Sequence, residues 1–322
     1  MTSLNIYEQQ ARNKRLTIVI MVLFILFLCF IGFGIDVQYQ IMERTSLPLA
    51  TLISVLVGTG SAFWSLQNGA STVLRSTGAM PANPNNPQHK LVLNLVEEMS
   101  IASGLPRPQV YIVPDDDPNA FATGKNPEKS YVAVTEGLLK TLNREELQGV
   151  IAHEMSHIRN YDIRLMTVVA ALVGAIILLS DFSRRGMLYG RNSSSSRRSS
   201  SSKNNGGALG ILVLALWLLS IILAPILARV MAMAISRKRE YLADASAAEL
   251  TRNPAALASA LEKIENAVSP TQSIKTGSAH LCIADPIGSK LNEKEGFLSE
   301  IFGTHPPIKK RIAALKSMSY LS

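Results

Sequence analysis

The chain of 322 residues is poor in charge and in cysteine. Only 17% of its residues are charged, against about 25% in an ordinary soluble domain, while 47% are hydrophobic. This balance excludes a disordered chain, argues against a purely soluble one and favours membrane-spanning segments. The two cysteines, Cys29 and Cys282, lie far apart in the sequence, which excludes a disulfide framework and a zinc site built from close cysteine pairs.

The net charge of +8 fits either nucleic acid or anionic lipid head groups as a partner. No nucleic-acid-binding motif accompanies the basic excess, and the serine- and arginine-rich stretch at 193–202 is typical of a solvated, disordered segment. We therefore expect the lipid bilayer, and not nucleic acid, to be a partner of this chain.

Four hydrophobic runs divide the sequence. The runs at 16–35 and 47–66 are uncharged and long enough, at about 1.5 Å per residue, to cross a hydrocarbon core of about 30 Å, so they predict a transmembrane hairpin. The run at 208–228 has a similar length. The run at 165–179 is shorter and fits either a span or a buried helix. Four spans are the favoured prediction, and a shallow hairpin over 165–228 stays open.

The remaining segments have the mixed composition of a soluble protein. They are a tail at 1–15 and two domain parts at 67–164 and 229–322, which are separated by the hydrophobic hairpin and its Ser/Arg-rich loop at 183–207. Short β-branched and aromatic stretches predict strands near 109–113, 119–124 and 130–135. We expect a mainly α membrane protein whose mostly helical soluble domain contains a small β-sheet.

The sharpest motif is the sequence HEMSH at His153–His157. A helix start with an N-cap and an acidic third position, Asn143–Glu146, precedes it, and residues four apart share one face of a helix. Two imidazoles at that spacing can bind one metal ion, and Glu154 beside the first lies toward a water on that metal. With only five histidines in the chain, chance is a poor explanation for this pattern.

A catalytic metal site needs a third protein ligand, with one position left to water. Glu240 and Asp244 are four residues apart in the sequence SRKREYLAD, which predicts two carboxylates on one helix face. Glu240 is the candidate ligand, and Asp244 can accept the spare N–H of a ligating histidine and fix its tautomer. The same pair alone fits an ordinary solvated helix, and it is the HEMSH motif that favours the metal site.

The two motifs together resemble those of the HtpX-like membrane zinc metalloproteases, relatives of the CAAX prenyl endoprotease. Two further segments agree with that family: NAFATG at 119–124, and THPP at 304–307 followed by RIAAL at 311–315. The two amino-terminal spans match as well. The resemblance covers nearly the whole chain, apart from the insert at 183–203.

The resemblance implies a zincin-like, zinc-dependent endopeptidase with one Zn²⁺ per chain, bound by His153, His157 and Glu240. Glu154 would be the general base that takes a proton from the metal-activated water. His305 is the candidate donor to the oxyanion, with helix capping as the alternative.

Further roles follow from the same resemblance. Asn119 resembles the family position that contacts substrate near the scissile bond, with a turn residue as the alternative. The region of Phe121 is expected to offer a strand edge to an extended peptide. Arg311 is expected either to serve the site or to pair locally.

The expected substrates are polypeptides, above all misfolded or damaged membrane proteins. The expected location is the bacterial inner membrane, with the catalytic domain in the cytoplasm. Arg12, Lys14 and Arg15 before the first span outnumber the single Arg44 in the connector, which agrees with that orientation. If the runs at 165–179 and 208–228 cross the membrane, the basic loop at 181–207 lies outside and does not agree with it. An intramembrane-type regulatory zinc protease and a non-catalytic membrane scaffold are the alternatives.

Overall fold

The computed structural model describes residues 6–43, 47–173, 237–267, 281–283 and 306–319. The predicted run at 208–228, the loop at 183–207 and the last residues of the run at 165–179 lie outside these ranges, so the number of spans stays a prediction. The chain divides into two compact units. The larger comprises Met1–Thr17, Ser65–Ala171 and Ala232–Ser322, and the smaller comprises Ile18–Trp64 and Leu172–Met231.

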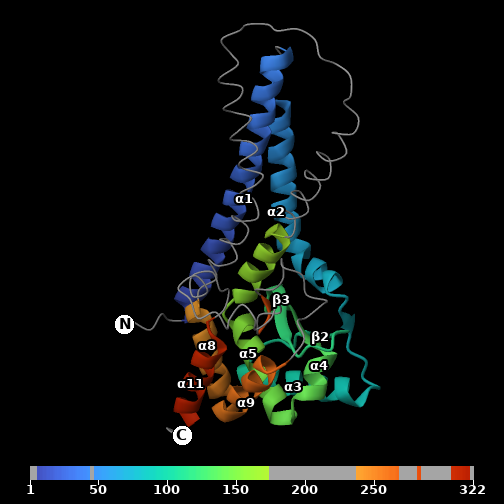
Figure 1. Cartoon of the computed structure of the whole chain (residues 1–322), viewed down its shortest axis with the longest axis vertical. Coiled ribbons are helices and arrows are strands. Elements are labelled where there is room, and N and C mark those ends of the chain that lie inside the picture. Colours follow the sequence, from blue (N-terminus) through green and yellow to red (C-terminus); the bar gives the residue numbers. More distant parts are fainter. Residues whose placement is uncertain (1–5, 44–46, 174–236, 268–280, 284–305, 320–322) are drawn as a thin grey trace. The chain divides into compact units, whose positions relative to one another are not determined.

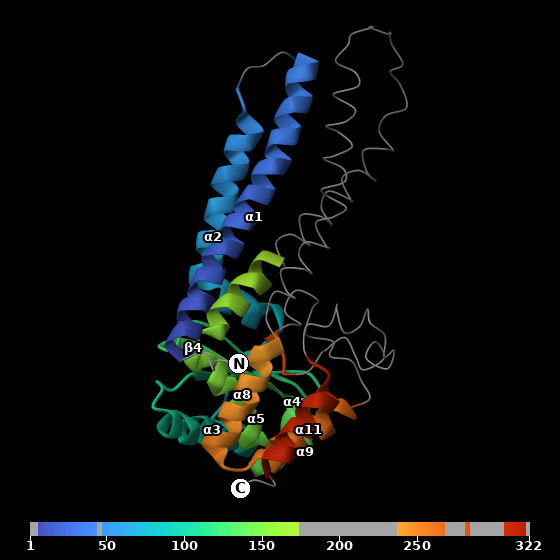
Figure 2. The ribbon, with the colours of Figure 1, turned by 90° about the vertical axis from the view of Figure 1, so that its left-hand side faces the viewer.

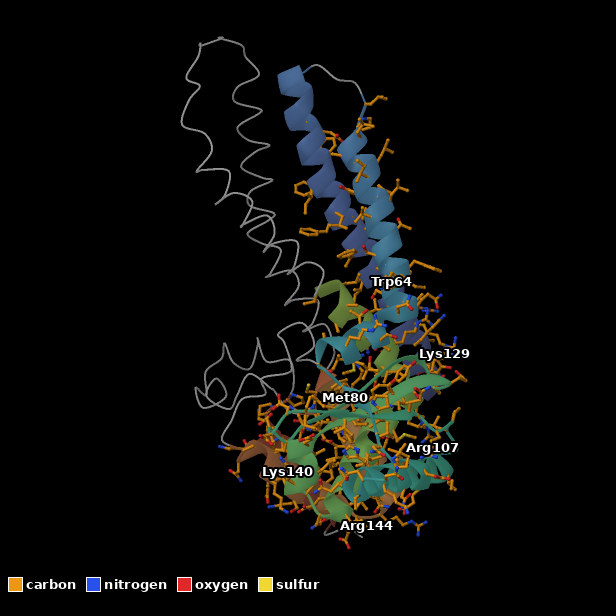
Figure 3. All side chains as sticks on the ribbon, turned by 90° about the vertical axis from the view of Figure 1, so that its right-hand side faces the viewer. Trp64, Met80, Arg107, Lys129, Lys140 and Arg144 are labelled. Atoms are coloured by element: carbon orange, nitrogen blue, oxygen red, sulfur yellow. The ribbon has the colours of Figure 1, made fainter. Side chains whose placement is uncertain are left out.

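The smaller unit contains most of two long helices, α1 (Ile6–Glu43) and α2 (Leu49–Ser76), which lie side by side in Figure 2. By length and composition, Gln10–Gly34 and Leu49–Ser76 could each cross a membrane. A Cβ added to Gly32 would lie 2.6 Å from Ala50 O, so the two helices approach closely there. Apolar side chains such as Trp64, which is 63% exposed, project outward from this pair (Figure 3).

The larger unit contains a four-stranded sheet of β1 (Met80–Pro81), β2 (Gln109–Val113), β3 (Ala120–Asn126) and β4 (Lys129–Thr135). The strand order is β1-β2-β4-β3, with β2 parallel to β4 and the other pairs antiparallel. The three predicted strands are confirmed. The two-residue strand β1 was not expected, because it lies in a proline- and asparagine-rich segment that sequence reasoning assigns to a boundary.

Helices pack on this sheet and on one another. Their bounds are α3 (Pro87–Ser103), α4 (Glu136–Thr141), α5 (Arg144–Arg159), α8 (Arg237–Thr251), α9 (Pro254–Glu265) and α11 (Ile308–Ser319), and a further helix is described over 162–173. Helix α5 lies against β3 and β4 and also packs on α8 and α9 (Figure 1). At Gly149 an added Cβ would lie 3.2 Å from the backbone of Leu257, so glycine permits the close approach of α5 and α9. Helix α5 is therefore held from several sides.

The start of α5 confirms the predicted cap. Asn143 Oδ1 accepts from Glu146 N at 2.9 Å, and Glu146 Oε2 accepts from Asn143 N at 2.8 Å. The Glu146 carboxylate also accepts from Ser259 Oγ and Lys263 Nζ on α9, each at 2.7 Å. Burial raises the pKa of Glu146, but the hydrogen bonds from Lys263, Asn143 and Ser259 outweigh it and hold the pKa below its ordinary value of 4.5.

Glu146→Gln is expected to lower the free energy of unfolding near neutral pH, because the ion pair with Lys263 is lost. The loss should be only about 1 kcal/mol, since Lys263 is partly exposed and water screens the pair. The pKa of Glu146 is lowered in the folded state, so its contribution is present above the unfolded pKa and is lost as pH falls through the folded value. Chemical denaturation of both proteins from neutral pH to below 4.5 should show their stabilities converge. The control is Glu145→Gln at the neighbouring exposed position, and a pH-independent gap would contradict the expectation.

Candidate metal centre

The second half of α5 brings the two histidines of the HEMSH motif together. His153 is 0% exposed and His157 is 4% exposed, and their Nε2 atoms lie 3.2 Å apart. The one-turn spacing along α5 creates this proximity, and the packing of the sheet and of α8 and α9 on α5 buries it. The predicted placement of both histidines on one buried helix face is therefore what the structure shows.

Glu240 in the first turn of α8 completes a group of three ligand atoms. Its Oε2 lies 3.7 Å from His153 Nε2, and its Oε1 lies 3.7 Å from His157 Nε2. Ligands about 2.0–2.2 Å from a tetrahedral zinc ion are about 3.3–3.6 Å from one another. The three residues therefore fit a zinc ion, and among the described residues they form the group of His, Cys, Asp or Glu side chains that could hold a metal.

A carboxylate lies behind each histidine. Asp244 Oδ1 is 3.0 Å from His153 Nδ1, although the angle departs from a regular hydrogen bond, and Asp162 Oδ2 is 3.1 Å from His157 Nδ1. A proton on each Nδ1 leaves both Nε2 lone pairs directed at the same point, which is the tautomer a metal ligand needs. The structure thus places Asp244 where the sequence predicted it.

Sequence reasoning missed Asp162. Helix α5 ends at Arg159 with Asn160 as its C-cap, and Tyr161 has a left-handed φ of 58°, so the backbone turns before Asp162. Helical periodicity cannot be carried across that turn. The available signal was an acidic residue shortly after the second histidine, which without the turn geometry is weak.

Arg311 on α11 was also underestimated. The side chain is 0% exposed, and it donates to both oxygens of Asp244, from Nε at 2.8 Å and from Nη2 at 2.7 Å. Its Nη1 donates to Ile283 O at 3.0 Å and lies 3.2 Å from Glu240 Oε2. Of the two alternatives left open for Arg311, local pairing is contradicted, because the bidentate partner is 67 residues away and packing of α11 against α8 brings the two together.

Glu154 is buried in the same region, with 1% of its surface exposed. Neither carboxylate oxygen makes a hydrogen bond of regular geometry. Burial raises the pKa of Glu154 to about 7, and the charge of Glu240 adds to this against the opposing effects of His157 and the Ala122 N–H. A carboxylate with a pKa near neutrality can take up a proton and give it back, which is what general acid–base catalysis requires.

The pKa values of the two histidines are shifted in opposite directions. Burial lowers the pKa of His153, and the positive charge of Arg311 adds to this against the hydrogen bond to Asp244. Burial also disfavours the charged form of His157, but its bond to Asp162 and the charge of Glu240 outweigh this and raise its pKa to about 9. The carboxylates around His157 therefore strongly favour positive charge at this point of the structure.

For two of the other predicted site residues, the structure gives a position but does not test the predicted role. Asn119 and Phe121 are each 1% exposed, at the start of β3, the strand whose Ala122 N–H faces Glu154. β3 is an edge of the sheet, but Ala120 O on its outer side accepts from Ile283 N at 2.9 Å, so 281–283 covers part of that edge. The roles of Asn119 and Phe121 stay predictions. His305 lies outside the described residues.

Comparisons with known proteins agree with this site. The sequence model of peptidase family M48 matches residues 87–319. A "Protease HtpX homolog" of Caldanaerobacter subterraneus subsp. tengcongensis is 43% identical over 320 residues, covering 99% of this chain and all of the relative. Proteins described in the same words from Thermoanaerobacter pseudethanolicus and Streptococcus gordonii are 44% and 41% identical over 320 and 314 residues, covering 99% and 97% of this chain and all of each relative.

One solved structure is similar in part. The crystal structure of S. mikatae Ste24p matches with a TM-score of 0.43 and 16% sequence identity. The match covers 87% of this chain and 60% of that one.

Proposed function

Because the chain belongs to peptidase family M48 and is a membrane metalloendopeptidase, we propose that His153, His157 and Glu240 bind one zinc ion per chain. We further propose that Glu154 is the general base of peptide-bond hydrolysis. The observation that carries the proposal is the buried group of His153, His157 and Glu240, one ligand atom from each lying within 4.8 Å of the others, with a carboxylate next to the Nδ1 atom of each histidine.

The charge balance of the site supports a divalent cation. Among the described residues, four buried carboxylates belong to the site and its direct contacts, and two buried guanidinium groups oppose them. The carboxylates are those of Glu154, Asp162, Glu240 and Asp244, and the guanidinium groups are those of Arg239 and Arg311. In the deprotonated state that metal binding requires, with neutral histidines and all four carboxylates ionised, the net charge is −2. An unbalanced charge of this size is costly away from water, and Zn²⁺ would neutralise it.

The residues of the site have distinct tasks in hydrolysis. Zinc in this position would lower the pKa of a bound water and polarise the peptide carbonyl. Glu154 accepts the proton of the attacking water and delivers it to the nitrogen of the leaving amine. Asp162 and Asp244 keep the histidine rings oriented, and His305 is our candidate donor to the oxyanion. The burial of Glu154 keeps competing water away from the proton it carries.

The proposed substrates are polypeptides, in particular misfolded or damaged membrane proteins. The described residues include two helices that are long and apolar enough to cross a bilayer. These helices support a substrate that is bound at the membrane. We place the reacting segment along the outer side of β3 from Ala122 onward, because 281–283 already pairs with Ala120 and Phe121, and we keep Asn119 and Phe121 as predicted contacts next to it. Ala122 is the position of this strand that faces Glu154, so a peptide paired there would lie beside the general base.

We propose that the catalytic residues lie on the cytoplasmic side of the bacterial inner membrane. Met1–Thr17 belongs to the same compact unit as the metal centre, which supports a shared side for the tail and the catalytic residues. The tail carries Arg12, Lys14 and Arg15, and basic residues next to a first span favour the cytoplasm.

Removal of one ligand tests the zinc site. After chelation, the purified protein in detergent should bind one zinc ion per chain on titration. Glu240→Gln should lower the zinc affinity by at least about 100-fold, because a direct ligand should matter at least as much as the residues that only orient ligands, whose loss costs up to about that factor. The control is Glu249→Gln, an exposed position on the same helix, which should bind as the wild type does. Equal zinc affinity in both variants would show that Glu240 is not a ligand.

A further inference from the structure

The first turns of α1 contribute an amide side chain next to the metal centre. Asn13 is 4% exposed, and its Nδ2 donates to Asn160 O at 3.0 Å and to Asp162 Oδ1 at 2.6 Å. Its Oδ1 accepts from Arg239 Nη1 at 3.4 Å. Both hydrogens of the amide and its oxygen thus have partners, so the amide has one favourable orientation.

Asp162 connects this amide to a metal ligand. Its Oδ1 accepts from Asn13, and also from Arg239 at 3.4 Å, whereas its Oδ2 lies 3.1 Å from His157 Nδ1. A carboxylate is planar and rigid, so donors that fix Oδ1 also fix where Oδ2 lies. The orientation of the His157 ring therefore depends on what holds the far oxygen of Asp162.

We propose that Asn13 is a positioning residue of the metal centre, which holds Asp162 and, through it, the orientation of His157. Asn13 is 149 residues from Asp162 in the sequence, so no local motif contains both. Asn13 lies near the start of the candidate membrane span Gln10–Gly34 of helix α1. The geometry of the metal centre is thereby tied to the entry of the first apolar helix.

Two neighbours of Asn13 offer a contrast. Gln10 Nε2 donates to Arg159 O at 2.9 Å, and Lys14 Nζ lies 4.4 Å from the centre of the Tyr161 ring. These contacts attach the start of α1 to the last residue of α5 and to the turn that follows it, as Asn13 does, but neither reaches Asp162. Gln10→Ala therefore removes an attachment of α1 and leaves the partners of Asp162 in place, which makes it the matched control.

The test measures metal affinity in the full-length protein in detergent, by competition with a chromogenic chelator. Asn13→Asp keeps the size of the side chain but replaces the donor at Nδ2 with an oxygen, which faces the Asp162 carboxylate. We expect zinc affinity to fall about 10-fold, the lower end of the range for outer partners of a ligand. The visible absorption spectrum of the cobalt-substituted protein should also change, because the His157 ring moves. Gln10→Ala should match the wild type in both measurements.

A double-mutant cycle separates positioning from general stability. In an Asp162→Ala background, Asn13→Ala should have no further effect on zinc affinity, because the intermediary is absent. Additive losses would overturn the proposal, and so would equal losses in Gln10→Ala and Asn13→Ala. If Asn13→Asp loses helical circular dichroism, the cycle with Asn13→Ala decides the question by itself.

This inference rests on the proposed zinc site, and the two can fail separately. If the wild type binds no zinc, the proposed site is wrong. If the wild type binds tightly and Asn13→Asp binds equally tightly with an unchanged cobalt spectrum, the zinc site stands and the role of Asn13 is wrong.

Discussion

Glu154→Gln is expected to lower the rate of peptide cleavage by about 10²–10⁴-fold, the contribution typical of a positioned general base. Glutamine has nearly the same shape but cannot accept the proton of the attacking water. Glu154 is not among the three ligand atoms, so zinc content should stay at the wild-type level. Cleavage of an unfolded model protein such as casein, measured together with zinc content, checks both parts of the expectation.

The matched control for this experiment lies on the same helix. Glu145→Gln makes the same chemical change at an exposed position in the first turn of α5 and should leave cleavage unchanged. Loss of zinc in Glu154→Gln would mean that Glu154 acts on the ligands and not on water. Retained cleavage with retained zinc would show that another group serves as the base.

Arg311→Met is expected to lower the free energy of unfolding by about 3–5 kcal/mol, the usual cost of removing one partner of a buried ion pair. Methionine fills much of the volume, so the loss arises mainly from charge. Asp244 would lose both hydrogen bonds of its guanidinium partner, and Glu240 would lose its contact at 3.2 Å. Chemical denaturation of the metal-free protein in detergent, followed by circular dichroism, gives the difference.

The nearby exposed residue Lys309 provides the comparison. Lys309→Met removes the same charge from α11 outside the buried network, so its effect should be within about 0.5 kcal/mol of zero. Adding Asp244→Asn to Arg311→Met should recover part of the lost stability, because the unpaired carboxylate is gone. If Arg311→Met and Lys309→Met were equally stable, the two hydrogen bonds from Arg311 to Asp244 would contribute nothing to the free energy of unfolding.

The proximity of the two histidines was predictable because it depends on a local rule. His153 and His157 share a helix face through the four-residue spacing, and the capping box at Asn143 and Glu146 defines where that helix begins. The three longer strands followed from β-branched and aromatic residues in a row. In these cases the sequence neighbours carry the information, so tertiary structure was not needed to recognise the pattern. The family resemblance found in the motifs is confirmed by the match to peptidase family M48 over 87–319.

The residues around the ligands were harder to predict because their partners are distant. Arg311 pairs with Asp244 across 67 residues, and Asn13 meets Asp162 across 149. Asp162 itself follows a left-handed Tyr161 that interrupts the helical period. A single sequence contains the residue types, but not the docking of α11 on α8 or of the first turns of α1 on the end of α5. The buried charge network around the ligands is therefore the part of the site that the structure shows and the sequence alone does not predict.

The separation of Glu240 and Arg311 along the chain has a consequence for synthesis. A ribosome that adds about 5–20 residues per second needs about 4–14 s to travel between these two positions. The last of the three proposed zinc ligands is thus made several seconds before the guanidinium that contacts Glu240 and binds Asp244. During translation, the ability to bind metal and the complete charge network are acquired at different times. A nascent chain that already carries every ligand still lacks the residue that joins two of its buried carboxylates.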